Sequence, residues 1–245
     1  MVAGEADRAV IDLATVAFNV PWLIEEQIRL LSTHLADKHR LTVFDNSNDR
    51  EAAREIERVC SGRVDYERLA VPSNYHHYAL NVAGKRLVDR GEQHIGFLDH
   101  DVFPRRKTRL IPRIKPSGFY GVGQRHGPTD SLYLWPGFCF FSTEWLTAKQ
   151  PRRLDFGGIR GADRKDDGDT GSMNAALFED EDWSRMFTGE HGYAALREPD
   201  SVGLQSWGYE VLGGDWIHLS NGSGWMVIPR PDERERLCQE LVASL

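Results

Sequence analysis

Apolar positions along the first hundred residues change spacing in a regular way, and this change predicts strands and helices in turn. Residues 9–18 (AVIDLATVAF) form a mostly apolar, β-branched run, which is typical of a buried strand. Asn19 can cap the helix that follows, where Pro21 suits the first turn and apolar residues recur at helical spacing as far as Leu35. The later elements of this half are predicted as strands at 41–44, 64–71 and 94–98, a helix that ends at Gly62, and a helix at about 74–90.

Strands and helices that alternate at these spacings predict right-handed βαβ units, and therefore a mostly parallel sheet. Ligands of such sheets gather at the carboxyl ends of the strands. Asp45 follows the second predicted strand, and Asp99 and Asp101 follow the strand at 94–98. The sequence therefore predicts that these acidic residues lie along one edge of the sheet.

The second half of the chain has a less regular pattern. No linker or internal repeat separates it from the first half, so we expect one domain over 1–245. A stretch at 152–171 is rich in Gly, Asp and Arg, and loops of this length are usually functional. The predicted elements are strands at 119–124 and 132–142, helices at 143–150, 172–178 and 231–245, and strand-like aromatic residues over 207–228.

Composition narrows the class of protein. Hydrophobic residues make up 40% and charged residues 27%, which is typical of a soluble globular protein. No apolar run is long enough to span a membrane, and no signal peptide is evident at the start. The three cysteines are far apart and form no metal motif, which favours a reducing, cytoplasmic setting. The net charge of −7 argues against nucleic acid as a partner.

Asp99 and Asp101 carry the strongest candidate chemistry. They leave an apolar strand two residues apart, as Asp99-His100-Asp101. Hard divalent cations such as Mg²⁺ or Mn²⁺ take carboxylate oxygens together with phosphate oxygens and water. The position at the end of a strand favours a metal–diphosphate clamp over the alternative, a polar turn with two solvated aspartates.

Four segments of the first 101 residues together resemble GT-A-type nucleotide-sugar glycosyltransferases, and family 2 in particular. The resemblance implies a GT-A (Rossmann-like) α/β fold, with a mostly parallel sheet flanked by helices. It also implies a nucleotide-binding half at 1–101 and an acceptor-side half at 102–245. The segments are AVIDLATVAFN (9–19), VFDNSND (43–49), PSNYHHYALNVAG (72–84) and HIGFLDHD (94–101).

The resemblance assigns roles to individual residues of the first half. Asp101 would bind the metal directly, and Asp99 would lie nearer the ribose or sugar while remaining a candidate metal ligand. The residues that would hold the nucleoside or its phosphates are Phe18, Asn19, Asp45 and Asn74, with Asn81 completing a pair of asparagines seven residues apart. Apart from the resemblance, His76 and His77 at the start of their predicted helix could touch the diphosphate or the donor sugar, or be merely exposed.

The sequence also departs from the pattern of the family. Asp45-Asn46 replaces the commoner pair of acids, and His76-His77 stands where small residues are frequent. The usual Glu-Asp pair before the acceptor-side helix is not evident. These departures leave open which residue is the catalytic base and which nucleotide is bound, more than they affect the fold.

The second half offers one further candidate metal ligand. Many GT-A enzymes take a third metal ligand from a C-terminal histidine, which would be His218 here. The Gly/Ser loop that follows it suits a diphosphate through Ser220 and Ser223. The alternative is a structural histidine followed by an ordinary turn.

Asp169 is the candidate general base, because it ends the long loop just before a short predicted helix. Its alternative role is to cap that helix, and Asp166 and Asp167 are nearby rivals for the role of base. Trp135 and Phe138 could form a platform for a sugar ring, although aromatic residues in strands more often belong to the core.

We therefore expect a divalent-metal-dependent glycosyltransferase that uses Mn²⁺ or Mg²⁺. Its donor would be a nucleoside-diphosphate sugar, and its acceptor a hydroxyl group of a small molecule or glycan. A sugar nucleotidyltransferase is the nearest alternative, but residues 17–21 lack the Gly-rich basic loop typical of that class. A non-catalytic protein that binds a nucleotide sugar or glycan is the other alternative. Dehydrogenase, kinase, hydrolase and zinc-protease motifs are not present.

Overall fold

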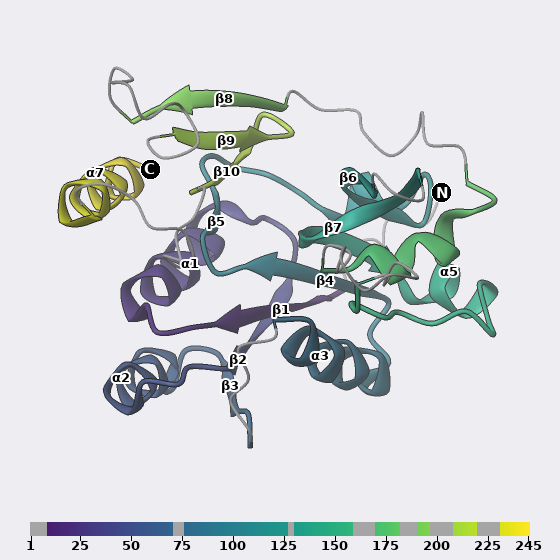
Figure 1. Ribbon diagram of the computed structural model, residues 1–245, viewed down its shortest axis with the longest axis horizontal. Coiled ribbons are helices and arrows are strands. Elements are labelled where there is room, and N and C mark those ends of the chain that lie inside the picture. The colour runs from purple at the N-terminus through teal and green to yellow at the C-terminus, as the bar shows by residue number, and fades with distance from the viewer. Residues whose placement is uncertain are drawn as a thin grey trace, which may run out of the picture.

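The computed structural model describes residues 9–70, 76–126, 130–158, 170–181, 191–196, 208–219 and 231–245. Figure 1 shows these residues as helices packed around two sheets. In chain order, the elements are β1 (Ile11–Ala17), α1 (Pro21–His34), β2 (His39–Asp45), α2 (Arg50–Cys60), β3 (Asp65–Arg68), α3 (His76–Arg90), β4 (His94–Asp99), β5 (Val102–Pro104), α4 (Ile111–Ile114), β6 (Phe119–His126), β7 (Ser131–Ser142), α5 (Thr143–Ala148), the 3₁₀ helix η2 (Ser172–Phe178), β8 (His191–Ala195), β9 (Gly208–Leu212), β10 (Trp216–His218) and α7 (Pro231–Ala243).

The larger sheet confirms the mostly parallel α/β arrangement predicted from the sequence. Within the described residues its strand order is β3-β2-β1-β4-β7-β6. β1 pairs in parallel with β2 and β4, and β2 pairs in parallel with β3, whereas β7 is antiparallel to both β4 and β6. The two antiparallel strands lie together at one side, so the parallel half of the sheet is continuous.

Helices cover both faces of this sheet, and β1 is buried on both sides as its apolar run predicts. Ile11 and Leu13 belong to a core cluster that includes residues of α1 and α2. Ala14 and Val16 point to the opposite face, where residues of α3 and η2 pack. The sheet therefore lies between two apolar layers, and the polar side chains lie in the loops at its edge.

The carboxyl ends of the parallel strands meet at one edge, as predicted. Ala17 at the end of β1 is in register with Asp45 of β2. Its neighbour Val16 is in register with Asp99 of β4. The ladder thus places the acidic residues of two strands on either side of the end of β1.

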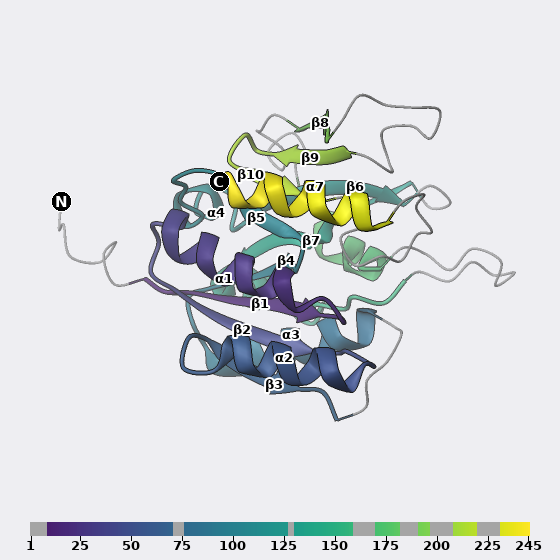
Figure 2. The same ribbon diagram turned by 90° about the vertical axis from the view of Figure 1, so that its left-hand side faces the viewer.

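The smaller sheet was not predicted as a sheet. Its order is β5-β10-β9-β8 in the described part of the chain, and all its pairs are antiparallel. A third apolar cluster joins it to α1 and α7 through Leu23, Phe103, Ile217 and Val242. Figure 2 shows α7, in yellow, running alongside α1 and this sheet.

The prediction that Asn19 caps the first helix is wrong. Val20 occupies the N-cap position of α1, and no side chain bonds to the cap. Asn19 instead has a φ of 55°, a left-handed conformation that asparagine tolerates better than most residues. Its side chain is therefore directed to a neighbouring loop and not to the helix.

No helix among the described residues is both long and apolar enough to cross a membrane.

Gly96 on β4 provides a test of the packing between the sheet and its neighbours. A Cβ atom there would lie 2.3 Å from Phe140 Cδ1 and 2.9 Å from Leu13 Cδ2, so Gly96→Ala must displace one of them. We expect the free energy of unfolding to fall by about 1–3 kcal/mol, the usual cost of overpacking a core. Thermal unfolding followed by circular dichroism measures the change.

Gly192→Ala on β8 is the matched control, because a Cβ there meets no described atom within 4 Å. Equal losses of stability in the two variants would contradict the packing argument.

Candidate functional site

The pairing of β5 with β10 brings together two candidate ligands that are far apart in the sequence. Asp101 immediately precedes β5, and its carbonyl accepts a hydrogen bond from the backbone N–H of Leu219 at 2.9 Å. Val102 of β5 is in register with His218 of β10. As a result, His218 Nε2 lies 3.6 Å from Asp101 Oδ1. The predicted neighbours therefore lie side by side, while their role in binding a metal stays a prediction.

Asp99 has its own histidine neighbour. His76 begins α3, and its Nε2 lies 3.6 Å from Asp99 Oδ1. His77, an expected donor contact, follows it on the same helix and is half-buried. Burial raises the pKa of Asp99, the His76 imidazole acts to lower it, and the Asp101 carboxylate raises it. A cation between these carboxylates would relieve their mutual repulsion.

His218 lies between two carboxylates. Burial acts to lower its pKa, but Asp101 and Glu210 outweigh burial, so the pKa is raised from its ordinary value. Its Nδ1 contacts Glu210 Oε2 on the neighbouring strand β9. The imidazole is thus held on one side by Glu210 and faces Asp101 on the other.

The donor types at this edge fit a divalent cation such as Mn²⁺. Asp99 and Asp101 offer hard oxygen ligands, and His218 offers an imidazole nitrogen that Mn²⁺ accepts. Among the described residues, no three or more His, Cys, Asp or Glu side chains are arranged as a complete metal-binding group. The candidates lie instead in two pairs, His76 with Asp99 and Asp101 with His218.

His100, between the two aspartates, has a structural contact. It is 4% exposed, and burial lowers its pKa to about 4, so its ring is neutral near pH 7. The backbone N–H of Phe18 donates to His100 Nδ1 at 3.3 Å. This bond ties the loop after β1 to the turn that carries Asp99 and Asp101.

Gln27 of α1 holds the same turn through two hydrogen bonds, and this role was not predicted from the sequence. Its side chain is fully buried on α1, and Nε2 donates to the carbonyl oxygens of Asp99 at 2.8 Å and Val102 at 3.0 Å. The signal that could have revealed it is a polar residue beside the apolar positions Ile24 and Ile28 of an amphipathic helix. A polar group in such a stripe must find a hydrogen-bond partner in the core.

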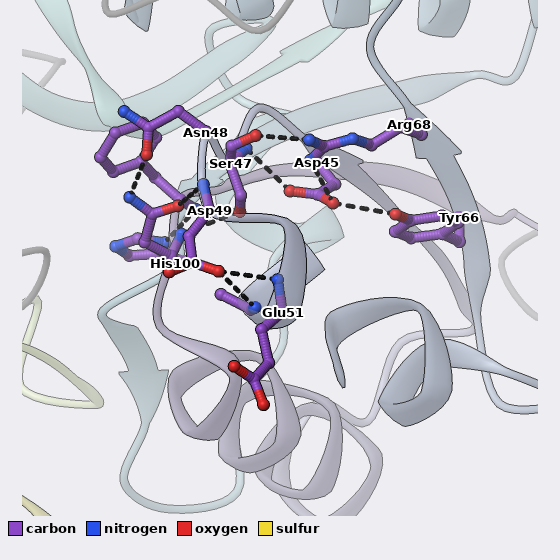
Figure 3. Close-up of polar contacts among 11 residues, drawn as sticks. Asp45, Ser47, Asn48, Asp49, Glu51, Tyr66, Arg68 and His100 are labelled. Carbon is purple, nitrogen blue, oxygen red and sulfur yellow. Dashed lines mark hydrogen bonds and ion pairs between the residues drawn. The ribbon is translucent and has the colours of Figure 1, made fainter. Parts of the chain in front are cut away.

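Asp45 is bound by donors of its own chain (Figure 3). It is fully buried, and Oδ1 accepts from the backbone N–H of Ser47 at 2.9 Å. Oδ2 accepts from the Tyr66 hydroxyl at 2.8 Å and from Arg68 Nη1 at 2.6 Å. Its expected contact with a nucleotide base stays a prediction.

Asn19 also makes its hydrogen bonds within the chain, to the loop after β2. Its backbone N–H donates to Ser47 Oγ at 2.8 Å, and its Nδ2 donates to Asn48 Oδ1 at 2.7 Å. Its Oδ1 accepts from the backbone N–H of Asp49 at 3.0 Å. Asn19 therefore joins the loop after β1 to the loop after β2, and its role toward a donor stays a prediction.

Of the two aromatic residues of the predicted sugar platform, Trp135 lies beside the metal candidates, whereas Phe138 is buried in the core. The Trp135 ring centroid is 4.6 Å from that of His218. A Cβ at Gly137 would lie 2.4 Å from Asp99 Oδ2, so the β7 backbone passes directly beside this carboxylate. A Cβ at Gly171 would lie 2.3 Å from Pro136 Cγ, so the segment that begins at residue 170 also reaches this place.

Four of the expected site residues lie outside the described residues. They are Asn74, Asp169, Ser220 and Ser223.

No protein-family model matches the chain, and no curated protein matches it. Similar solved structures include the mannosyltransferase PcManGT from Pyrobaculum calidifontis in complex with GDP-Man and Mn²⁺, at 15% identity and a TM-score of 0.46, over 63% of this chain and 49% of that one. They also include S. aureus TarS 1-349 in complex with UDP-GlcNAc, at 17% identity and a TM-score of 0.44, over 60% of this chain and 48% of that one. The chain spans about half the length of these two structures.

Gln27→Met tests whether α1 holds the aspartate turn. The variant keeps a similar volume but leaves the carbonyls of Asp99 and Val102 without their buried donor, at a cost of about 1–3 kcal/mol. We expect lower stability by this amount in thermal unfolding, and weaker Mn²⁺ binding in calorimetry because the turn loosens. Glu25→Met, at an exposed position of the same helix, is the control. Wild-type Mn²⁺ affinity in Gln27→Met would show that the turn is set without Gln27.

Proposed function

We propose that the chain is a divalent-metal-dependent glycosyltransferase that moves a sugar from a nucleoside-diphosphate sugar to a hydroxyl acceptor. The observation that carries this proposal is the approach of His218 to Asp101, at 3.6 Å, beside Asp99 at the carboxyl edge of the parallel strands. Oxygen and imidazole donors at this edge suit a cation that also binds a diphosphate.

The donor would lie across the ends of β1, β2 and β4. Asp99, Asp101 and His218 would hold Mn²⁺ or Mg²⁺, which when bound stabilises the negative charge of the departing diphosphate. His77 at the start of α3 would contact the phosphates or the sugar. The nucleoside and the diphosphate would be held by Phe18, Asn19, Asp45, Asn74, Ser220 and Ser223.

The acceptor would approach near Trp135. This ring is half-buried against His218, so one part of it is available to stack on a sugar. Asp169 would take the proton from the acceptor hydroxyl if the transfer inverts the anomeric centre. Support comes from Gly171, two residues later in the sequence, which contacts Pro136 next to the segment that borders Asp99.

Donor turnover tests the proposed activity. Thermal shifts with a panel of nucleoside diphosphates and nucleotide sugars, with and without Mn²⁺, identify the donor class. Release of nucleoside diphosphate in the presence of hydroxyl acceptors then supports a transferase. Mn²⁺-dependent binding without any release would instead indicate a non-catalytic binding protein, and pyrophosphate formed from a sugar phosphate and a nucleoside triphosphate would indicate a nucleotidyltransferase.

Asp101→Asn tests the metal-binding role. The substitution keeps the shape of the side chain but removes its charge, so Mn²⁺-dependent donor affinity should fall by at least about a hundredfold, since even residues behind the ligands cost 10–100-fold. Calorimetric titration of the nucleotide sugar with and without Mn²⁺ measures this. Asp89→Asn, at an exposed site on α3, is the matched control. Unchanged affinity in Asp101→Asn would remove the metal site from the proposal.

Asp169→Asn tests the catalytic base. Donor affinity should stay unchanged while the transfer rate falls by about 10²–10⁴-fold, as expected for the loss of a general base. Asp166→Asn tests the rival base in the same acidic segment and should keep the wild-type rate if Asp169 is the base. Steady-state release of nucleoside diphosphate measures both variants, and a wild-type rate in Asp169→Asn would leave Asp169 only the role of a helix cap.

A further inference from the structure

A row of polar side chains crosses the smaller sheet and ends at the candidate metal ligands. Tyr193 of β8 is in register with Glu210 of β9, and Glu210 is in register with His218 of β10. Residues directly opposite one another on neighbouring strands have side chains on the same face, close enough to interact. The next strand, β5, places Val102 opposite His218, one residue after Asp101.

Two contacts hold the His218 ring in position. Glu210 Oε2 contacts Nδ1, and the Trp135 ring packs against the imidazole. Glu210 and His218 have side chains that are 14% and 15% exposed, so water competes little for this bond. Tyr193 hydrogen-bonds to the same carboxylate from the outer strand.

The chemistry of these groups sets the position of the imidazole proton. An ionised carboxylate only accepts hydrogen bonds, so Nδ1 must carry the proton that Glu210 accepts. In the neutral ring, Nε2 is then left with a lone pair. Nε2 lies 3.6 Å from Asp101 Oδ1, too far for a hydrogen bond between them. The lone pair of His218 Nε2 and the Asp101 carboxylate are therefore directed toward the same space.

We propose that Glu210 is the positioning residue of His218, which it holds in the Nδ1–H tautomer with Nε2 directed toward the space beside Asp101. The proposal rests on the metal site of the proposed function, because its purpose is to present a metal ligand. A carboxylate behind a ligating histidine fixes the tautomer and orients the ring, and losing it typically lowers metal affinity 10–100-fold.

The first experiment needs no metal and no substrate. Nitrogen-15 NMR of the histidine rings, in metal-free protein in alkaline buffer, reports which ring nitrogen carries the proton. We expect the Nδ1–H tautomer of His218 in the wild type and a shift toward Nε2–H in Glu210→Leu. An Nε2–H tautomer in the wild type, or an unchanged tautomer in Glu210→Leu, would overturn the proposal.

The second experiment measures Mn²⁺ affinity by calorimetry. The dissociation constant should rise about 10–100-fold in Glu210→Leu, and less in Glu210→Gln, because an amide oxygen can still accept from Nδ1. Glu55→Leu on α2, where Glu55 pairs only with the exposed Arg58 among the described contacts, is the control and should bind as the wild type does. Unchanged affinity in Glu210→Leu would also overturn the proposal.

These measurements separate the inference from the proposed function. A wild type that binds no Mn²⁺ overturns the metal site, whereas the NMR experiment still decides whether Glu210 sets the tautomer. If Glu210→Leu does not fold, as judged by circular dichroism, Glu210→Gln and Tyr193→Phe replace it. Both should raise the Mn²⁺ dissociation constant, and wild-type values in both would overturn the role of Glu210.

Discussion

The site depends on one short antiparallel pairing, that of β5 with β10. Each strand has three residues, and their ladder is the connection that puts His218 next to Asp101. Strands this short are not stable alone, so their pairing needs support from packing. Phe103 and Ile217 provide it, because both are buried in the cluster shared with α1 and α7. The placement of His218 next to Asp101 thus depends on the apolar packing of Phe103 and Ile217.

The parallel half of the fold could be predicted because its elements are long enough to show a hydrophobic period. The smaller sheet could not, since a three-residue strand such as β5 has no period to detect. The edge that carries Asp45 and Asp99 followed directly from the order of strands and helices. Gln27 and Glu210 were missed for different reasons. The partners of Gln27 are more than seventy residues away, and its only local signal is its place in the apolar stripe of α1. Glu210 meets His218 only through the pairing of β9 with β10, which was not predicted.

Some polar residues at this edge stabilise the loops through hydrogen bonds, whereas others are the candidate metal ligands. The side chain of Asn19 joins the loop after β1 to the loop after β2, and that of Asp45 joins the loop after β2 to β3. His100 ties the same region to the aspartate turn through Phe18. The candidate metal ligands lie in two pairs. Asp99 lies 3.6 Å from His76, and Asp101 lies 3.6 Å from His218. Hydrogen-bonded loops therefore surround the two pairs of candidate ligands.

The docking of α7 onto α1 has a mechanical consequence. Arg29 of α1 donates to the carbonyl of Val242 at 3.1 Å, while Gln27, two residues earlier, holds the turn that carries Asp99. Helix α1 is therefore joined to the aspartate turn and to α7 by hydrogen bonds, and to β10 by apolar packing. A displacement of α7 should therefore be passed through α1 to the turn that carries Asp99.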